Sequence, residues 1–243
     1  MLEVDDSGRK RQEYGLIQAI KKAVMMNENN PISISTGKSQ LNNIYNAKTY
    51  GFRQATGYEP YTDVQLTYNQ SKQYNLSLKG DDAPSLAGGG LTGLRKIAPN
   101  LIATFYKQAF DQLIDAGYKE GDNVPDIFAR IPNQYREKII VGNAEMGGPI
   151  DYMYKGPMAV HYTYDRDRNL LKFNGTILTA KEFAKTTDLY FRLRKRSKDQ
   201  TFDLKEEKEG LPAIFGRSNM SRGYGGRLMT TDRVPASGFV IRL

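Results

Sequence analysis

The sequence predicts an α+β fold, in which a mostly antiparallel sheet packs on a central helix and extended arms lie at both ends. Three observations favour this class. Residues 99–116 carry apolar side chains at helical spacing, whereas 151–196 holds short runs in which apolar and polar residues alternate. The chain, at 243 residues, is also long enough to bury a sizeable core. We expect three regions: an N-terminal helix and extended arm at 1–60, an α+β core at 61–196, and a basic Gly/Arg-rich segment at 197–243.

The N-terminal region is predicted to contain one helix. Residues 8–27 place Ile17, Ile20 and Val24 on one side, which is typical of an amphipathic helix, and the polar residues that follow end it. Residues 28–60 are rich in Asn, Ser, Gly and Tyr and show little periodicity. We expect an extended arm there, suited to wrapping around a neighbouring subunit.

The first half of the core predicts a hairpin and two helices. Alternating residues on both sides of a polar connection indicate a β-hairpin at 61–79. A helix begins at Pro99, a residue suited to a first turn, and stops at Gly117. A shorter helix is expected from Pro132 to just before Gly142.

The second half of the core reads mainly as strands. Asn174-Gly175 is a strong signal for a tight turn, and Thr179 with Glu182 has the spacing of a capping box. The last strand has one basic face, because Arg192 and Arg194 alternate with apolar residues. The strands expected here are 158–164, 170–173, 176–178 and 189–193.

Composition excludes several kinds of site. There is no cysteine, so disulfides, thiolate metal sites and cysteine nucleophiles are excluded. His161 is the only histidine, which excludes a metal site built from several histidines. No stretch is apolar enough for a membrane span, and we expect neither a cofactor nor a membrane partner.

Two strings resemble nucleotide-binding motifs but lack their context. Gly88-x-Gly90-x-x-Gly93 matches the dinucleotide fingerprint, yet a loop precedes it and Pro99 delays the helix, so we interpret it as a hinge. Thr36-Gly37-Lys38-Ser39 resembles the end of a P-loop, but Ile32 stands where the first glycine is required.

Acidic and histidine side chains give no catalytic pattern. His161 lies in a predicted strand, and no serine near a nucleophile elbow could complete a triad with it. Asp165 and Asp167 flank an arginine at a predicted hairpin tip, where turn chemistry explains them better than a metal site. The sequence therefore favours a protein that is not an enzyme.

Positive charge is concentrated at the C-terminal end. The net charge is +8, and residues 192–243 hold 12 Lys and Arg against 6 Asp and Glu, which is +6. Such a segment is suited to an anionic partner. A short Arg-Gly-Tyr-Gly-Gly-Arg element resembles sequences that bind single-stranded nucleic acid. The residues expected to contact an anion or nucleic acid are Arg192, Arg194, Lys195, Arg196, Lys198, Arg222, Tyr224 and Arg227.

The arrangement of these parts resembles virion structural proteins of tailed bacteriophages, of the neck, ring or connector type. The resemblance covers the whole chain and is carried by the polar aromatic arm (32–61), the glycine hinge (88–93), the central helix (99–116), the β core (151–196) and the Gly/Arg tail. It implies assembly in the host cytoplasm, a homo-oligomeric ring, contacts with other virion proteins and a DNA channel.

These observations leave three functions open. The first is a structural assembly subunit of a phage particle, a head–tail connector, acting through subunit interfaces and a basic surface. The second is a nucleic-acid-binding protein that uses the same basic residues. The third is a metal-dependent nuclease with carboxylates spread along the sequence. Tyrosine supplies wide contact area, and the residues expected at subunit interfaces are Tyr45, Tyr50, Tyr58 and Tyr61.

Overall fold

The computed structural model describes residues 8–50, 60–81, 85–86, 97–195, 200–208, 210–215, 227–229 and 237–243. It divides the chain into two compact units, each built from two segments. Unit 1 comprises Met1–Ala83 and Ile140–Lys185, and unit 2 comprises Pro84–Ile139 and Thr186–Leu243. The predicted boundaries at 60 and 196 do not coincide with these units, because strands far apart in the sequence pair with one another.

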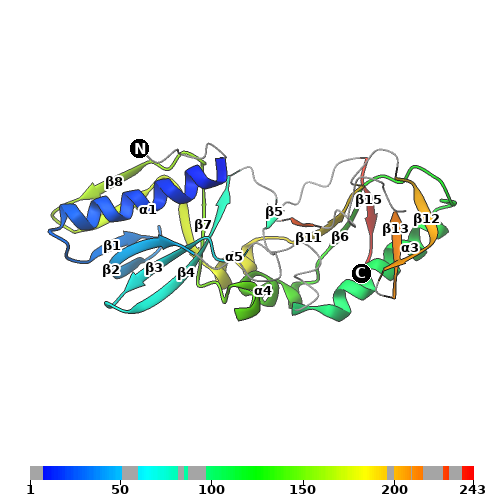
Figure 1. The fold of residues 1–243 in the computed structure, drawn as a ribbon, viewed down its shortest axis with the longest axis horizontal. Helices are drawn as coiled ribbons and strands as arrows, with labels where there is room; N and C mark the ends of the chain where they lie inside the picture. The colour runs from blue at the N-terminus through cyan, green and yellow to red at the C-terminus, as the bar shows by residue number, and fades with distance from the viewer. Residues whose placement is uncertain are drawn as a thin grey trace. The chain divides into compact units, whose positions relative to one another are not determined.

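Unit 1 is a sheet of eight strands that packs on helix α1 (Gly8–Met26) (Figure 1). Most neighbouring strands are antiparallel, but β4 pairs with β7, and β1 with β9, in parallel. Two short elements, η1 (Ala144–Met146) and α5 (Ala180–Thr186), complete the unit. In spatial order the strands are β10 (Thr176–Thr179), β7 (Tyr152–Gly156), β4 (Lys72–Gly80), β3 (Val64–Tyr68), β2 (Gln40–Thr49), β1 (Ile32–Ser35), β9 (Leu170–Phe173) and β8 (Tyr162–Asp165).

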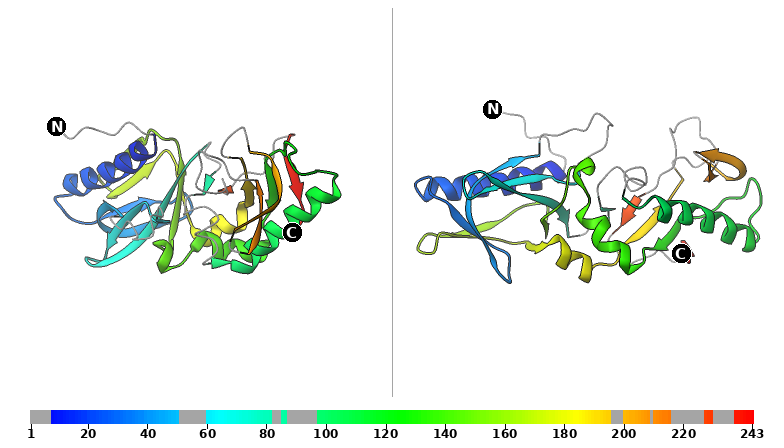
Figure 2. Two further views of the ribbon diagram at one scale, coloured as in Figure 1. Left: turned by 45° about the vertical axis from the view of Figure 1, so that its right-hand side comes forward. Right: turned by 90° about the horizontal axis from the view of Figure 1, so that it is seen from below.

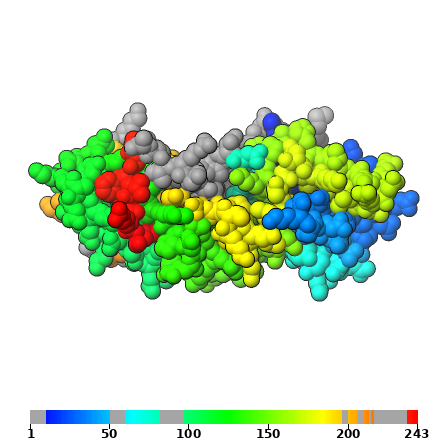
Figure 3. Space-filling view, turned by 180° about the vertical axis from the view of Figure 1, so that it is seen from behind, coloured from blue at the N-terminus to red at the C-terminus, as the bar shows by residue number. Residues whose placement is uncertain are grey.

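The core of unit 1 lies between α1 and the sheet. Leu16 and Ile20 of the helix are fully buried against side chains such as Ile34, Leu66 and Leu76 of the strands. The hairpin predicted at 61–79 is confirmed as β3 and β4, and the N-terminal helix is confirmed as α1. Figure 3 shows β1 and β2, in blue, beside the yellow-green β8–β9 hairpin, as the pairing of β1 with β9 requires.

The expected N-terminal arm differs from the structure. Residues 32–35 and 40–49 form β1 and β2, which are inner strands of the sheet. β1 alternates regularly but has only four residues. In β2 the buried residues are Leu41, Ile44 and Ala47, three positions apart, because the register of this strand shifts once against β1 and once against β3. Such bulges change which face the following residues take, so the period of two was hidden in the sequence.

Unit 2 holds two smaller sheets. The five-stranded sheet has the order β15 (Phe239–Ile241), β6 (Ile127–Arg130), β11 (Tyr190–Leu193), β14 (Arg227–Met229) and β5 (Ser85–Leu86). β12 (Phe202–Lys208) and β13 (Leu211–Phe215) form a hairpin within 197–243, which we expected to be a basic Gly/Arg-rich segment. Buried Phe202 and Phe215 at its open end account for the difference, since they anchor a segment that is otherwise charged.

Helix α3 (Pro99–Asp115) packs in unit 2 against β13 and β15 (Figures 1 and 2). Its buried side includes Phe105, and the centre of the Phe105 ring lies 5.2 Å from the centre of the Phe191 ring in β11. The predicted bounds of this helix are confirmed. We expected it to pack on the large sheet, but the helix that packs there is α1. Helix α4 (Asn133–Val141), also as predicted, ends before Gly142.

The α+β class and the mainly antiparallel pairing are therefore confirmed. The predicted strand at 158–164 is shorter, since only β8 from Tyr162 is extended and paired, whereas β7 precedes it at Tyr152–Gly156. Pro157 follows β7 directly and lacks the backbone N–H that would continue the ladder. Of the two glycine motifs, 88–93 lies outside the described residues, and Thr36–Ser39 forms the turn between β1 and β2.

Candidate functional site

One face of the unit 1 sheet buries charged side chains, which is uncommon in proteins. Side chains alternate between the two faces of a strand, so Leu66, Leu76 and Leu78 point to α1 and their neighbours point to the other face. On that other face Asp63 and Lys79 are 8% and 5% exposed. Burying a carboxylate and an ammonium group costs free energy unless specific contacts compensate. Their position is therefore the first candidate for a site.

Asp63 is held at the start of β3 by the facing strand. Its Oδ2 accepts a hydrogen bond of 2.7 Å from the backbone N–H of Leu78 and one of 3.2 Å from the hydroxyl of Ser77. Its own backbone N–H donates to the carbonyl of Leu76 at 3.0 Å, which extends the β3–β4 ladder by one residue. The carboxylate therefore has a fixed position on the sheet.

Lys79 lies two residues beyond Ser77 on β4 and so takes the same face as Asp63. In the β3–β4 register Val64 faces Leu76, which puts Asp63 opposite Ser77 and Lys79 one diagonal step away. Diagonal neighbours on one face are about 7–8 Å apart at their α-carbons, within reach of a long side chain. A buried carboxylate and a buried amine thus share one small area.

Lysine and threonine side chains extend this area across the sheet. β4 and β7 are parallel, and Lys79 is in direct register with Lys155, whose side chain is exposed. On the next strand, β10, Thr176 is in register with Lys155. We refer to Asp63, Ser77, Lys79 and Lys155 together as the polar face.

The carboxyl ends of β4 and β7 are tied to α1 by Gln12, which is 1% exposed. The side-chain amide of Gln12 donates to the carbonyls of Lys79 at 3.3 Å and of Gly156 at 2.9 Å. The backbone N–H of Asp81 also donates to the carbonyl of Gly156 at 3.1 Å. Two strands that are distant in the sequence are therefore held together at the end that carries the lysines.

A second carboxylate, Asp151, lies just before β7 on the same face. Its Oδ2 accepts a 2.7 Å hydrogen bond from the backbone N–H of Asn75. The side-chain amide of Gln65 donates to the side-chain oxygen of Asn75 at 3.0 Å. Burial raises the pKa of Asp151 above its ordinary value, although the hydrogen bond from Asn75 opposes this. Across the sheet Asp151 lies beside Asn75, whereas Asp63 lies beside Ser77, two residues farther along β4.

The predicted basic strand is partly neutralised. Arg192 in β11 donates to Asp126 through Nε at 3.0 Å and Nη2 at 2.5 Å, and its guanidinium lies 5.7 Å from the ring centre of Phe128. Lys195 donates to the side-chain oxygen of Asn123, and Arg194 is half-buried after the strand ends. Arg196, Lys198, Arg222 and Tyr224 lie outside the described residues, as does the side chain of Arg227.

The predicted interface tyrosines are not brought together on one described surface. Tyr61 is 3% exposed, and its ring packs beside Gly142, so it belongs to the interior of unit 1 and not to a free surface. Tyr45 and Tyr50 are half-buried, Tyr50 close to Gly147, and Tyr58 lies outside the described residues. Tyr61 was misassigned because an aromatic residue in a polar stretch looks the same in sequence whether it faces a partner or its own chain.

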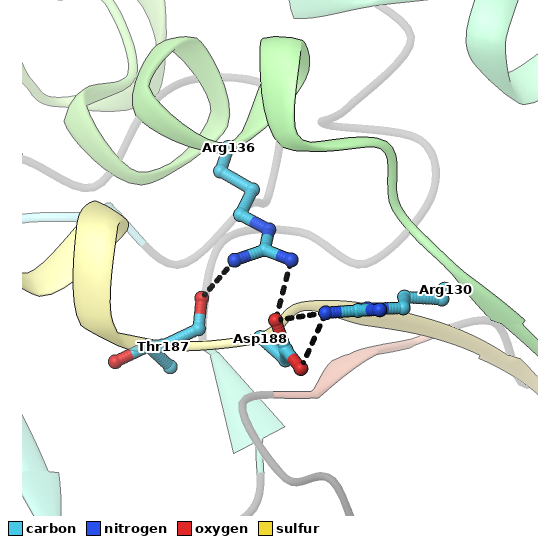
Figure 4. A network of polar contacts seen from close by, with 4 residues as sticks. All are labelled: Arg130, Arg136, Thr187 and Asp188. Carbon is cyan, nitrogen blue, oxygen red and sulfur yellow. Dashed lines mark hydrogen bonds and ion pairs between the residues drawn. The ribbon is translucent and has the colours of Figure 1, made fainter.

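A charged network in unit 2 links three elements (Figure 4). Asp188, before β11, accepts hydrogen bonds of 2.9 and 2.8 Å from Arg130 at the end of β6 and makes an ion pair with Arg136 of α4. Arg136 is 7% exposed and also donates to the carbonyl of Thr187 at 3.5 Å. These arginines hold the pKa of Asp188 below its ordinary value. The network fastens α4 to the sheet.

Two other predicted features have structural roles. His161 is exposed next to β8, and its backbone N–H donates to Asn174. Asp165 accepts from the backbone N–H of Arg168 at 3.2 Å in the turn between β8 and β9, as turn chemistry predicts. Within the described ranges there is no group of three or more acidic or histidine side chains that could hold a metal ion. No helix in the same ranges is long and apolar enough to cross a membrane.

The sequence interpretation missed the polar face, although one signal was available. In the predicted hairpin apolar and polar residues alternate regularly, so the pairing register of its two strands could be inferred from the position of the turn. That register would have put Asp63 opposite Ser77 and close to Lys79, which are charged positions next to an apolar face. Lys155 could not be found in this way, because β7 joins from a distant part of the chain. Comparison with protein-family models, with curated proteins and with solved structures found no match.

Proposed function

We propose that the protein hydrolyses phosphodiester bonds of nucleic acid at the polar face of unit 1, with the help of a divalent cation. The observation that carries the proposal is the burial of Asp63 and Lys79 on the same face of adjacent strands. Of the functions that the sequence left open, this is the third, the metal-dependent nuclease. A net charge of +8 favours an anionic polymer as the substrate.

Asp63 would be the cation ligand. Magnesium in phosphate-processing sites is held by one or two carboxylates together with phosphate oxygens and water, so a large cluster of acidic residues is not required. The hydrogen bonds from Leu78 and Ser77 both end on Oδ2 and fix the orientation of the carboxylate. The cation would polarise a phosphate oxygen and its bound water.

Lys79 would hold the reacting phosphate by its charge. In hydrolysis the oxygen of water forms a bond to phosphorus and the water gives up one proton. One phosphorus–oxygen bond to the sugar breaks, and the sugar oxygen leaves as a hydroxyl because it takes up one proton. Negative charge on the phosphate oxygens in this step is stabilised by a fixed ammonium group. The burial of Lys79 strengthens such an interaction, because nearby water screens it less.

The test is a cleavage assay with purified full-length protein, plasmid DNA and single-stranded DNA and RNA, in Mg²⁺, Mn²⁺ or a chelator. We expect metal-dependent cleavage of at least one substrate. Asp63→Asn and Lys79→Met should each lower the rate by at least about 100-fold, since each removes charge at the reacting phosphate. Circular dichroism should show that both variants remain folded.

Asp165→Asn and Lys172→Met serve as matched controls, because Asp165 lies in an exposed part of a turn and Lys172 is an exposed strand residue. Both controls should cleave at the wild-type rate. The proposal fails if wild-type protein cleaves none of these substrates with either metal, or if Asp63→Asn remains as active as the controls.

A second candidate, the assembly subunit, is supported by the exposed face of α1. Tyr14 is 53% and Met25 is 71% exposed, and they are three helical turns apart, so they lie on one side of the helix. Large exposed apolar groups favour a contact with another protein. Sedimentation at several concentrations tests this: Tyr14→Ser with Met25→Ser should dissociate any oligomer, and a wild-type monomer at high concentration would contradict it.

A further inference from the structure

We infer that strand β8 is an interface at which two copies of this chain pair their β8 strands antiparallel and join their unit 1 sheets. Among the described residues β8 is an edge strand, because it has a neighbouring strand on one side only, β9. Figure 3 shows the β8–β9 hairpin, in yellow-green, on the surface of unit 1. The inference is independent of hydrolysis, since it uses none of the residues of the polar face, and it names a contact on which an assembly role would depend.

The backbone of β8 directs two residues away from β9. In the ladder between these strands the carbonyl of His161 accepts a hydrogen bond of 3.0 Å from the N–H of Asn174. Residues of an antiparallel strand bond alternately to one side and to the other, so Thr163 also bonds to β9. The N–H and C=O groups of Tyr162 and Tyr164 therefore point to the side on which the described residues supply no strand.

β8 lacks features that commonly protect an edge strand from other chains, such as lysine, proline and bulges. Tyr162–Asp165 contains neither lysine nor proline, and its register with β9 runs without a shift. The other edge strand of the sheet, β10, is protected in part, because the outward N–H of Thr179 donates to the carboxylate of Glu182 at 3.1 Å. β8 is therefore the edge of unit 1 that is better suited to a further strand.

The sequence of β8 is complementary to itself. Two copies related by a twofold axis at Thr163 pair Tyr162 of one chain with Tyr164 of the other, in both directions, which gives about four backbone hydrogen bonds. Both tyrosines lie on the face of the sheet that packs on α1, so the pairing also brings aromatic side chains together. Thr163 meets the same threonine of the second copy, and a threonine pair on opposite strands is stabilising.

On the other face the same register sets complementary groups across from each other. His161 of one copy lies opposite Asp165 of the other, and no like charges face each other between positions 161 and 165. Asp165 accepts from the backbone N–H of Arg168 through Oδ1, and its Oδ2 is 3.9 Å from Nε of Arg168. A carboxylate can accept about four hydrogen bonds, so Asp165 can accept a further one from the imidazole of His161. This register therefore favours a second copy of the chain over an unrelated strand.

The exposed part of α1 adjoins the same edge. Gly15 packs against the side chain of Val160, which directly precedes His161. Tyr14, the neighbour of Gly15 in the helix, is 53% exposed. A large exposed aromatic side chain close to an edge strand favours a contact with another protein at this place.

The test is the mass of the full-length protein in solution, measured by sedimentation equilibrium over a range of concentrations. We expect wild type to be in equilibrium between monomer and dimer. Thr163→Glu places two carboxylates opposite each other at the twofold axis and should raise the dissociation constant of the dimer by at least about tenfold. Thr163→Lys should do the same. An equimolar mixture of the two variants should dimerise again, because unlike charges then meet.

Thr176→Glu is the matched control. Thr176 is also an exposed threonine on an edge strand, and it faces Lys155 as Thr163 faces Lys172. This control should dimerise like wild type, and circular dichroism should show that all variants remain folded. A wild type that stays monomeric at high concentration would overturn the inference, and so would a dimer that Thr163→Glu leaves intact or that both glutamate variants weaken equally. The cleavage assay decides the hydrolytic function separately, since neither threonine is among the residues of the polar face.

Discussion

Single charged residues secure the fold at two places in the described ranges. Asp188 bridges Arg130 and the buried Arg136 and so fastens α4 to β6 and β11. Asp63 binds the facing strand β4, because its carboxylate accepts hydrogen bonds from the backbone N–H of Leu78 and the hydroxyl of Ser77. The polar face differs from the network around Asp188 in burying both a carboxylate and an amine on adjacent strands, and the function is proposed there for this reason.

Asp188→Asn should destabilise unit 2. The change leaves the buried guanidinium of Arg136 without its carboxylate, and an unsatisfied buried charged donor costs about 1–3 kcal/mol. Urea unfolding followed by circular dichroism measures the loss. Asp165→Asn, in an exposed turn, is the control and should change stability by less than about 0.5 kcal/mol. Equal losses for the two variants would show that the network contributes nothing.

The contribution of Asp188 should also depend on pH. Its pKa is lowered in the folded protein from an ordinary value of 3.8, so the folded state favours the charged carboxylate. Such a group stabilises the protein at pH values above 3.8, and this stabilisation is lost as the pH falls through the lower folded value. The difference in unfolding free energy between wild type and Asp188→Asn should therefore be constant at neutral pH and shrink below about pH 4. A difference that grows on acidification would contradict this assignment.

At the scale of elements, local signals in the sequence predicted local structure well. Helix α5 begins at Ala180 because Thr179 and Glu182 form the predicted capping box: the hydroxyl of Thr179 accepts from the N–H of Glu182 at 3.1 Å, and the carboxylate of Glu182 accepts from the N–H of Thr179 at 3.1 Å. The helix from Pro99 and the hairpin at β3–β4 were equally accessible. Each depends only on residues a few positions apart.

Thr179→Ala should lower stability by about 0.5–2 kcal/mol, because it removes an N-terminal cap from a helix of seven residues. Thr179→Ser keeps the hydroxyl group and should recover most of the loss. Thermal unfolding of the two variants and the wild type provides the measurement. If serine and alanine destabilise equally, the hydroxyl is not the stabilising group.

Elements that depend on distant partners were the ones that the sequence left undetermined. β2 was missed because bulges disturb its alternation, and β1 because it has only four residues. β12 was missed because its charged residues hide the buried Phe202. The polar face shares this limitation. Asp63, Ser77 and Lys79 lie on one hairpin and were within reach of a register argument, whereas Lys155 joins them only through parallel pairing of β4 with β7.

At the scale of the whole molecule, each unit has its own buried core, and the tyrosines of unit 1 make it sensitive to alkali. Burial raises the pKa of Tyr74 and of Tyr154 to about 12 each, from 10.0, and raises that of Tyr61 as well. The folded state therefore favours the neutral phenols. Their stabilisation is present below pH 10 and is lost as the pH rises from 10 toward 12.

Unit 1 should consequently lose stability between about pH 10 and about pH 12. Tyr154→Phe should reduce this loss, because the buried phenol that resists ionisation is then absent. The same substitution at Tyr135 of α4 is the control in unit 2. Unfolding by urea at stepped alkaline pH gives the free energies. A Tyr154→Phe variant with the same alkaline loss as wild type would rule out this tyrosine as a cause.

The order in which strands of unit 1 are synthesised has a consequence for how the chain acquires its structure. β1 pairs with β9, and β4 pairs with β7, but both partner strands are synthesised only after Pro84–Ile139 has been translated. During that interval the nascent sheet has two open edges with unpaired backbone groups, and such edges recruit other chains. Fast completion of translation, or a chaperone that covers these edges, should therefore decide the yield of native protein in the cell. A protein truncated after Ala83 should aggregate for the same reason.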